Sequence, residues 1–184
     1  MESKKAAILL ADNFEEVEAT VPYDLLNRAG VKTDLISVKN QKTVKGNVGM
    51  HYTDLMMMKD TDFDDYDCLI IPGGDGYVVF ANDPQVLDLI KEFGTNPNKV
   101  LGAICAGASI PGKLGLYDGK NYTCVPGLNG EFGGNYEKVH AVMDGNIVTG
   151  ISVGGAYQFA LDLIKALVSD EKAAEIAAST CWVL

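Results

Sequence analysis

Three continuous apolar runs constrain the fold of this chain more than any other feature. They span residues 5–11, 66–71 and 100–104, and a turn-forming or small-residue segment follows each one at once. Apolar runs without polar alternation are typical of strands that are buried on both faces, as in parallel sheets. Segments with helical periodicity lie between the runs. This alternation predicts a three-layer α/β sandwich with a mainly parallel sheet.

The remaining elements are predicted from periodicity and from end signals. Asn13 is expected to cap a first helix in a capping box with Glu16, and Pro22 is expected to kink or restart that helix before Gly30. Asp83 followed by a proline predicts another helix start. The other predicted strands span residues 31–38, 122–125, 138–142 and 146–151, and the other predicted helices span 83–94, 154–168 and 170–180.

Size and charge limit the classes of function. The chain has 184 residues, which suits a single domain over residues 1–184. Its formal net charge is −10 and it has no basic cluster, so we expect no nucleic-acid partner. No apolar stretch approaches the length of a membrane helix, and the first apolar run is too short for a signal peptide. We therefore expect a cytoplasmic protein without a membrane partner.

Polar and small residues follow three of the predicted strands. They form the segments 12–18, 72–74 and 105–106. In parallel sheets, sites lie at the carboxyl ends of the strands. The sequence therefore predicts that these three segments meet in one site.

Cys105 is the strongest candidate for a reactive group. It lies between Ala103 and Gly107, in a small-x-nucleophile-x-Gly pattern similar to a nucleophile elbow. If a helix begins directly after it, the helix N-terminus is expected to lower the pKa of its thiol and to favour the thiolate. The alternative is a buried structural cysteine, which is common for free cysteines.

Two further groups complete the predicted site. The backbone N–H groups of Gly74 and Ala106 are expected to form an oxyanion hole, although Pro72-Gly73-Gly74 could also be a plain turn. Glu18 is expected to be buried near the sulfur, with a pKa raised by desolvation and by like charge. It would then hydrogen-bond the sulfur or exchange a proton with substrate. Alternatively, Glu15, Glu16 and Glu18 all belong to a solvated first helical turn.

Neither histidine can be paired with Cys105 from the sequence. His51 lies in a loop-rich region and His140 in a predicted strand, so either would have to reach the cysteine through the fold. Cys124 is a candidate resolving thiol or a structural residue. Two other cysteines are interpreted as structural: Cys68 and Cys181. No cluster has metal-ligand spacing, and we expect neither a metal nor a cofactor.

Taken together, these motifs resemble the ThiJ/PfpI superfamily. Within it the chain is most similar to the deglycase branch associated with parkinsonism (DJ-one) and its bacterial relative YajL. The resemblance runs from Glu15-Glu16-Val17-Glu18 through Pro72-Gly73-Gly74 and Ala103-Ile104-Cys105-Ala106-Gly107 to the C-terminal segments Gln158–Leu161 and Glu171–Ala174. It covers nearly the whole chain.

The resemblance implies a flavodoxin-like sandwich of the class I glutamine amidotransferase-like type, usually a homodimer. It implies that Cys105 is an oxidation-sensitive nucleophile, that Glu18 hydrogen-bonds it, and that Gly74 and Ala106 are the backbone donors. Members are described as cofactor-independent glyoxalases, deglycases, redox-dependent chaperones and oxidative-stress sensors. Some relatives are called cysteine peptidases.

One position and one segment depart from the pattern of that branch, and a further position differs from the peptidase branch. Val125 stands where the branch has its pocket histidine, and a valine cannot transfer a proton. The segment 151–154 reads Ile-Ser-Val-Gly in place of Arg-Gly-Pro-Gly. Ala106 replaces the histidine that follows the nucleophile in the peptidase branch, which argues against peptidase activity.

Two functions remain as main hypotheses. In the first, the protein is a glyoxalase or deglycase in carbonyl-stress defence, whose Cys105 thiolate adds to reactive aldehydes or to glycated groups. In the second, it is a non-catalytic redox sensor or chaperone, in which Cys105 is oxidised to a sulfinate. The substitution at Val125 favours the second. An enzyme of thiamine-precursor metabolism is a third possibility, but the chain has no P-loop motif to support it.

Overall fold

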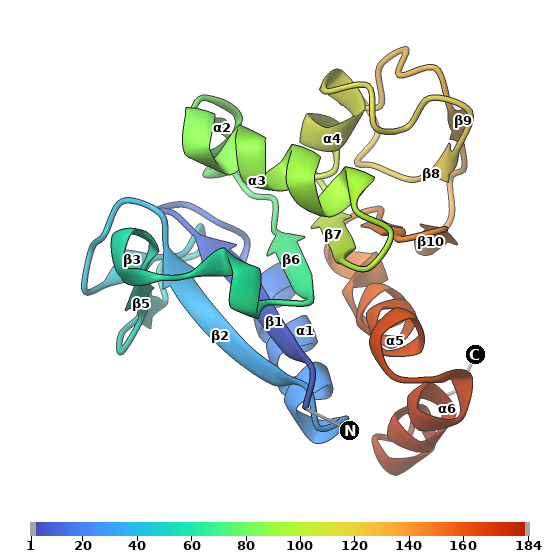
Figure 1. The fold of residues 1–184 in the computed structure, drawn as a ribbon, viewed down its shortest axis with the longest axis horizontal. Helices are drawn as coiled ribbons and strands as arrows, with labels where there is room; N and C mark the ends of the chain where they lie inside the picture. Colours follow the sequence, from blue (N-terminus) through green and yellow to red (C-terminus); the bar gives the residue numbers. More distant parts are fainter. Residues whose placement is uncertain (1–2, 183–184) are drawn as a thin grey trace.

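A seven-stranded sheet forms the centre of the protein in the computed structural model, which describes residues 3–182 (Figure 1). Its strand order is β10-β11-β7-β6-β1-β2-β5. These strands are β1 (Lys5–Leu10), β2 (Lys32–Ser37), β5 (Met56–Met57), β6 (Cys68–Ile71), β7 (Val100–Ile104), β10 (Ala141–Asp144) and β11 (Ile147–Gly150). All neighbours pair in parallel except β10, which is antiparallel to β11 at one edge. The predicted mainly parallel sheet is confirmed.

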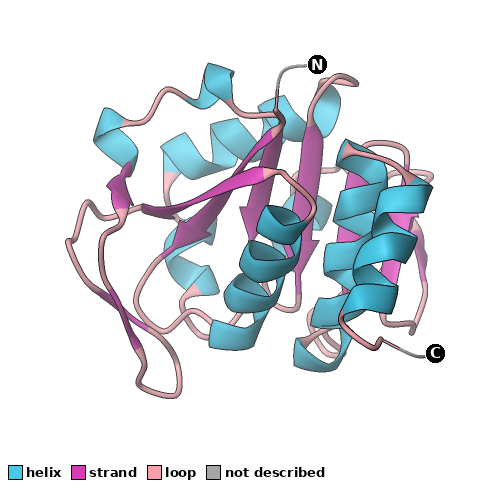
Figure 2. Ribbon diagram, turned by 90° about the horizontal axis from the view of Figure 1, so that it is seen from below, coloured by secondary structure: helices cyan, strands magenta, loops and turns pink. Residues whose placement is uncertain are grey.

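Helices cover both faces of the sheet, as Figure 2 shows. The helices α1 (Glu16–Arg28), α5 (Ala156–Leu167) and α6 (Asp170–Ser179) pack on one face. The helices α2 (Tyr77–Ala81), α3 (Pro84–Thr95) and α4 (Ser109–Lys113) pack on the other. Alternate residues of β1 point to opposite faces, so that Ile8 joins the first core and Leu9 the second. The α/β sandwich predicted from the apolar runs is therefore confirmed.

Several short elements lie outside the seven-stranded sheet. The strands β3 (Val44–Lys45) and β4 (His51–Tyr52) form a small antiparallel hairpin, and β8 (Asn121–Tyr122) pairs in parallel with β9 (Asn135–Tyr136). Three 3₁₀ turns complete the described elements: η1 (Met58–Asp60), η2 (Phe63–Asp65) and η3 (Val153–Gly155). The sequence predicted neither α2 nor the pairing of β8 with β9.

The start of α1 differs from the prediction. Asn13 has a left-handed backbone with φ of 65°, so it is not the N-cap; Glu15 stands there without a side-chain cap bond. Glu16 bonds instead to the β3–β4 hairpin, since its carboxylate accepts from the N–H groups of Val48 (2.9 Å) and Met50 (3.4 Å). The predicted capping box was therefore wrong, because tertiary contacts use the side chain that was expected to close it.

Pro22 does not divide α1, which is continuous from Glu16 to Arg28. At an internal position of a helix, the backbone N–H normally donates to the carbonyl four residues earlier. A proline has no N–H and leaves that carbonyl free. Pro22 therefore frees the Glu18 carbonyl, whereas the Thr20 hydroxyl donates to a different one, that of Glu16, at 2.6 Å. An unbroken α1 holds Glu18 and Leu25 on the same buried side.

Other predicted boundaries are closer to the structure. Asp83 caps α3 by accepting from the N–H groups of Gln85 and Val86, as predicted, although the helix continues past Gly94 to Thr95.

Within residues 3–182, no helix combines the length and the apolarity needed to cross a membrane.

Candidate active site

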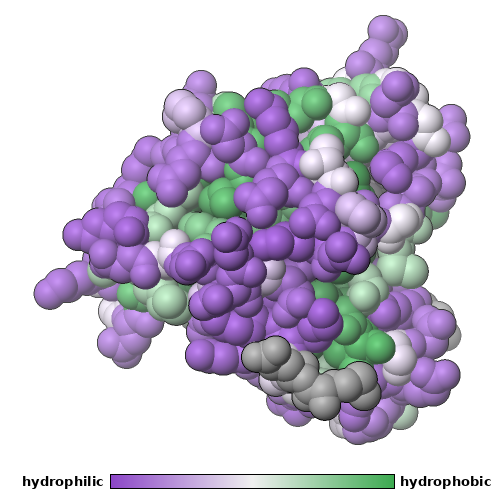
Figure 3. All heavy atoms as spheres, viewed as in Figure 1, coloured by the Kyte–Doolittle hydropathy of each residue, from purple (hydrophilic) through white to green (hydrophobic). Residues whose placement is uncertain are grey.

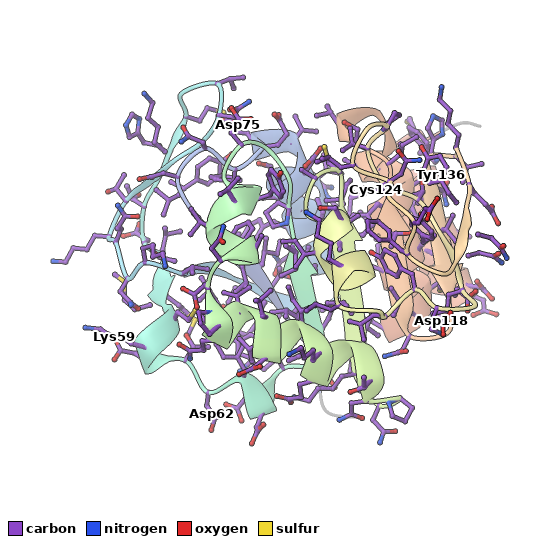
Figure 4. The ribbon with its side chains drawn as sticks, turned by 90° about the horizontal axis from the view of Figure 1, so that it is seen from above. Lys59, Asp62, Asp75, Asp118, Cys124 and Tyr136 are labelled. Atoms are coloured by element: carbon purple, nitrogen blue, oxygen red, sulfur yellow. The ribbon has the colours of Figure 1, made fainter. Side chains whose placement is uncertain are left out.

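The carboxyl ends of four adjacent strands bring the candidate site together. β1, β6, β7 and β11 are neighbours and parallel, so the segments that follow them meet at one edge of the sheet. In Figure 4, Asp75 and Cys124, from two of the loops at this edge, lie on the opposite side of the molecule from Lys59 and Asp62. The predicted convergence of three segments is confirmed, and residues after β11 form a fourth.

Cys105 directly follows β7 in a backbone conformation that favours glycine. Its φ is 58°, and a left-handed conformation costs a residue with a side chain roughly 1–2 kcal/mol. Hydrogen bonds hold the residue on both sides: its N–H donates to the Gly150 carbonyl at 2.9 Å, and its carbonyl accepts from the N–H of Val125 at 3.5 Å. Such strain is often found at functional positions.

Small residues make the turn possible, as the elbow pattern predicted. A Cβ on Gly107 would lie 2.5 Å from the Pro72 carbonyl oxygen. A Cβ on Gly73 would lie 2.7 Å from both the Cys105 Cβ and the Glu18 Oε2. The loop after β6 therefore packs directly against the cysteine, and no side chain fits between them.

Glu18 is completely buried next to this turn. Its Oε2 accepts the Gly73 N–H at 2.8 Å, while its Oε1 is buried and has no hydrogen-bond partner among the described residues. Burial raises the pKa of the Glu18 carboxyl to about 7, although the Gly73 N–H and the Cys105 thiol act against the rise. Glu15 adds a smaller upward effect through its charge. The raised pKa agrees with the sequence prediction.

The pKa of the Cys105 thiol, by contrast, shifts in the direction opposite to the prediction. Burial, followed by the charge of Glu18, raises it to about 11. The Ser152 hydroxyl and the Ala106 N–H act in the other direction. The expected depression by a helix end fails because α4 begins only at Ser109 and is five residues long. Burial and the charge of Glu18 both favour the protonated thiol over the thiolate.

The two groups together form an acid–base pair. A carboxylate with a pKa near 7 is a far better proton acceptor than an ordinary glutamate, and it faces a thiol that must lose a proton to react. An adjacent base is one established means of activating a cysteine nucleophile. The site can therefore produce a thiolate by transfer of a proton from Cys105 to Glu18.

Two backbone donors remain available at the site. In the described chain, the N–H groups of Gly74 and Ala106 donate to no backbone carbonyl, whereas the N–H of Gly73 is engaged by Glu18. Gly74 has φ of 77°, and a Cβ there would lie 2.5 Å from the Asn13 carbonyl oxygen, so this position requires glycine. These N–H groups can stabilise an oxyanion that forms beside the sulfur.

Ser152 is the site residue that the sequence did not predict. It lies two residues beyond β11, and its Oγ is 3.5 Å from the Cys105 Sγ. In the sequence, the segment 151–154 stood out only because it reads Ile-Ser-Val-Gly in place of Arg-Gly-Pro-Gly. The parallel pairing of β11 with β7, which places their carboxyl ends side by side, was the signal that could have found it.

The remaining candidates do not join the reactive pair. Val125 is half-buried beside Cys105, while His51 and His140 are exposed and neither perturbs the thiol. Cys124 is fully buried, its thiol donates to the Cys105 carbonyl at 3.3 Å, and burial raises its pKa to about 12. These contacts favour a structural role for Cys124 behind Cys105; in Figure 4 it lies near Tyr136 of β9.

Potential metal ligands do not cluster in the described part of the chain. Within residues 3–182, no three histidine, cysteine, aspartate or glutamate side chains are grouped so that they could hold a metal ion.

Fold and site define a class: α/β sandwich proteins with a cysteine on a strained turn after a central parallel strand and a buried glutamate beside it. The chain belongs to the DJ-1/PfpI family, whose model matches residues 4–166.

Sequence relatives extend over most of the chain. Protein dj-1beta of Drosophila melanogaster is 31% identical over 184 residues, covering 95% of each chain. A protein of Schizosaccharomyces pombe named glutathione-independent glyoxalase DJ-1 is 31% identical over 180 residues, covering 91% of this chain and 93% of the relative. A putative cysteine protease, YraA of Bacillus subtilis, is 32% identical over 150 residues, covering 80% and 88%.

Solved structures agree with this assignment. The crystal structure of Drosophila melanogaster DJ-1beta aligns with a TM-score of 0.90 at 28% identity, covering all of both chains. The structure of Schizosaccharomyces pombe DJ-1 aligns with a TM-score of 0.86 at 30% identity, covering 95% of this chain and 97% of that one.

Proposed function

We propose that this protein is a cofactor-independent glyoxalase or deglycase, which acts on reactive aldehydes through Cys105. The observation that carries the proposal is the pairing of a cysteine on a strained turn with a buried carboxyl whose pKa is about 7. The relative from Schizosaccharomyces pombe, named as a glutathione-independent glyoxalase, supports the same activity.

The reaction begins with addition of the sulfur to the aldehyde carbon of an α-oxoaldehyde. As the S–C bond forms, the thiol proton moves to Glu18 and the carbonyl π electrons move to oxygen, where Gly74 and Ala106 N–H groups stabilise the charge. Glu18 returns its proton to that oxygen, which yields a hemithioacetal.

Glu18 then shuttles a second proton. It removes the hydrogen from the former aldehyde carbon as a proton and returns it to the neighbouring carbon, while the hydroxyl proton on the former aldehyde oxygen moves to the neighbouring oxygen. This leaves a 2-hydroxy thioester on Cys105. Water cleaves the thioester and releases a 2-hydroxy acid and the free thiol. The sum is oxoaldehyde plus water giving hydroxy acid, so neither an external oxidant nor a reductant is needed.

The test is turnover of methylglyoxal by the purified protein and by two variants. Cys105→Ser should abolish the activity, and Glu18→Gln should lower kcat by about 10²- to 10⁴-fold, the usual contribution of general acid–base catalysis. Lys59→Ala, at the far end of the molecule in Figure 4, is the control. Absence of turnover with several aldehydes, together with clean peroxide-driven addition of oxygens to Cys105, would reject the enzyme.

The second candidate is a redox sensor or chaperone in which Cys105 is oxidised to a sulfinate by a peroxide. One observation favours it: no histidine perturbs the cysteine, and Val125 occupies the position where this branch of the family has one. Oxidation needs only a thiolate and nearby donors. Intact mass after peroxide treatment, with and without Cys105, separates this function from the first.

We also propose that the protein is a cytoplasmic homodimer without nucleic-acid partners. The face in Figure 3 is mostly hydrophilic, with apolar side chains scattered between polar ones. Apolar side chains are most exposed at the β3–β4 hairpin, where Val48 is 74% and Met50 57% exposed. Light scattering of the protein and of a Val48→Glu variant would test whether a second copy covers this hairpin.

A further inference from the structure

Ser152 owes its position to the pairing of two strands. Gly150, the last residue of β11, lies opposite Ile104, the last residue of β7. The Cys105 N–H donates to the Gly150 carbonyl at 2.9 Å, which fixes the two chains just before they separate. Ser152 follows in extended conformation, and its Oγ lies 3.5 Å from the Cys105 Sγ. The contact is therefore set by the frame of the sheet and not by a mobile loop.

Among the described residues, the Ser152 hydroxyl makes no side-chain hydrogen bond other than the one to Cys105. The residue stands before η3, where serines commonly cap helices, but its side chain makes no cap bond. Ser169, at the start of α6, provides a comparison within the same chain, because its Oγ accepts the Lys172 N–H at 3.2 Å. One serine thus stabilises a helix end, and the other has its hydroxyl directed to the sulfur.

A thiolate at Cys105 would have few donors around it. The titratable groups that face the sulfur are Glu18 from α1 and Cys124 from the segment after β8, and neither is a cation. Val125 contributes only a methyl-bearing side chain. Besides the Ala106 N–H and a protonated Glu18, the Ser152 hydroxyl is the group among the described residues that acts on the sulfur and can donate to it.

We propose that Ser152 is a catalytic residue whose hydroxyl donates a hydrogen bond to the Cys105 thiolate and thereby sets its reactivity. The residue takes over part of the stabilisation that a cation or an imidazole would give. This role rests on the proposed reactivity of Cys105, but it holds for aldehyde addition and for oxidation alike, because both begin from the thiolate.

The experiment measures the pH dependence of Cys105 alkylation by iodoacetamide, followed at the Cys105 peptide by mass spectrometry. It uses a Cys181→Ser background, because Cys181 is exposed while Cys68 and Cys124 are buried. Ser152→Ala should raise the apparent thiol pKa by about one unit, so that alkylation at pH 7 slows about tenfold. Ser152→Thr keeps a hydroxyl and should remain within about twofold of the parent rate.

Ser169→Ala is the matched control, since it removes a serine hydroxyl at another helix start. It should lower the melting temperature and leave the thiol pKa unchanged. Ser152→Gly removes the same hydroxyl as Ser152→Ala and serves as the second variant if the alanine protein does not fold.

An unchanged thiol pKa in the folded Ser152→Ala or Ser152→Gly protein would overturn the proposal, as would an equal rise in Ser169→Ala. These results do not depend on turnover of any aldehyde. Failure of the glyoxalase function is therefore distinguishable from failure of the role of Ser152.

Discussion

At the scale of single residues, Cys105, the candidate nucleophile, has an unfavourable backbone conformation. Its φ of 58° lies in the region that glycine adopts without steric cost, yet the position holds a cysteine. The surrounding hydrogen bonds from Val125 and to Gly150 keep the residue in that conformation. Such a backbone is common at functional positions, so it supports the prediction that Cys105 is reactive.

Two substitutions at this position separate strain from chemistry. Both Cys105→Gly and Cys105→Ala remove the sulfur and should be inactive. The glycine variant should nevertheless be more stable than the alanine variant by about 1 kcal/mol, because only glycine is relaxed at positive φ. Denaturant unfolding of both proteins measures the difference, and an alanine variant of equal or higher stability would contradict the assignment of strain.

At the scale of elements, the first turn of α1 performs two tasks with neighbouring carboxylates. Glu18 points toward the reactive turn, while Glu16 is buried against the β3–β4 hairpin. One oxygen of Glu16 accepts two N–H groups of the hairpin and the other is buried without a partner among the described residues. The Asn47 N–H also donates to the Phe14 carbonyl at 2.8 Å, which joins the hairpin to the start of the helix.

Glu16→Ala should release the hairpin while leaving the sheet intact. Loss of the carboxylate leaves the Val48 and Met50 N–H groups without their acceptor, at a cost of about 1–3 kcal/mol. Limited proteolysis should then cut within residues 45–50 faster than in the parent. Glu15→Ala is the control, because the Glu15 side chain makes no cap bond. Equal cleavage of both variants would show that Glu16 does not hold the hairpin.

The elements also show which features of the fold and of the site could be predicted from the sequence. The apolar runs predicted the sheet, and the residues after them predicted Cys105, Glu18 and the glycine turn, because strand burial and turn chemistry are local properties. The capping box of Asn13 and Glu16 failed because the carboxylate prefers N–H groups more than 30 residues away in the sequence. Ser152 was missed for the same reason: its contact depends on which strand lies beside β7.

At the scale of the whole molecule, burial of Glu18 links stability to pH. The carboxyl has a pKa of about 7 in the folded protein and an ordinary value near 4.5 when exposed. Below pH 4.5 both states are protonated at this group, so its favourable contribution is fully present. As the pH rises from 4.5 through 7, the unfolded state ionises first and that contribution is lost. Folding is therefore opposed at neutral pH by a charge that the site requires.

Glu18→Gln should remove this linkage. The free energy of unfolding of the variant, relative to the parent, should increase by about 3 kcal/mol between pH 4.5 and pH 8. Urea unfolding of both proteins at several pH values measures the difference. A difference that stays constant over this range would mean that the pKa of Glu18 is not raised by folding.

The separation of the site residues along the chain has a consequence for biosynthesis. The sulfur and the Ser152 hydroxyl are 47 positions apart, and β11 must be added beside β7 before they can meet. During translation the amino-terminal part emerges first. Until β11 emerges, the nascent chain thus carries a cysteine that has neither this neighbouring strand nor its serine neighbour. Cys105 acquires its full surroundings only after β11 and Ser152 have emerged and joined the sheet beside β7.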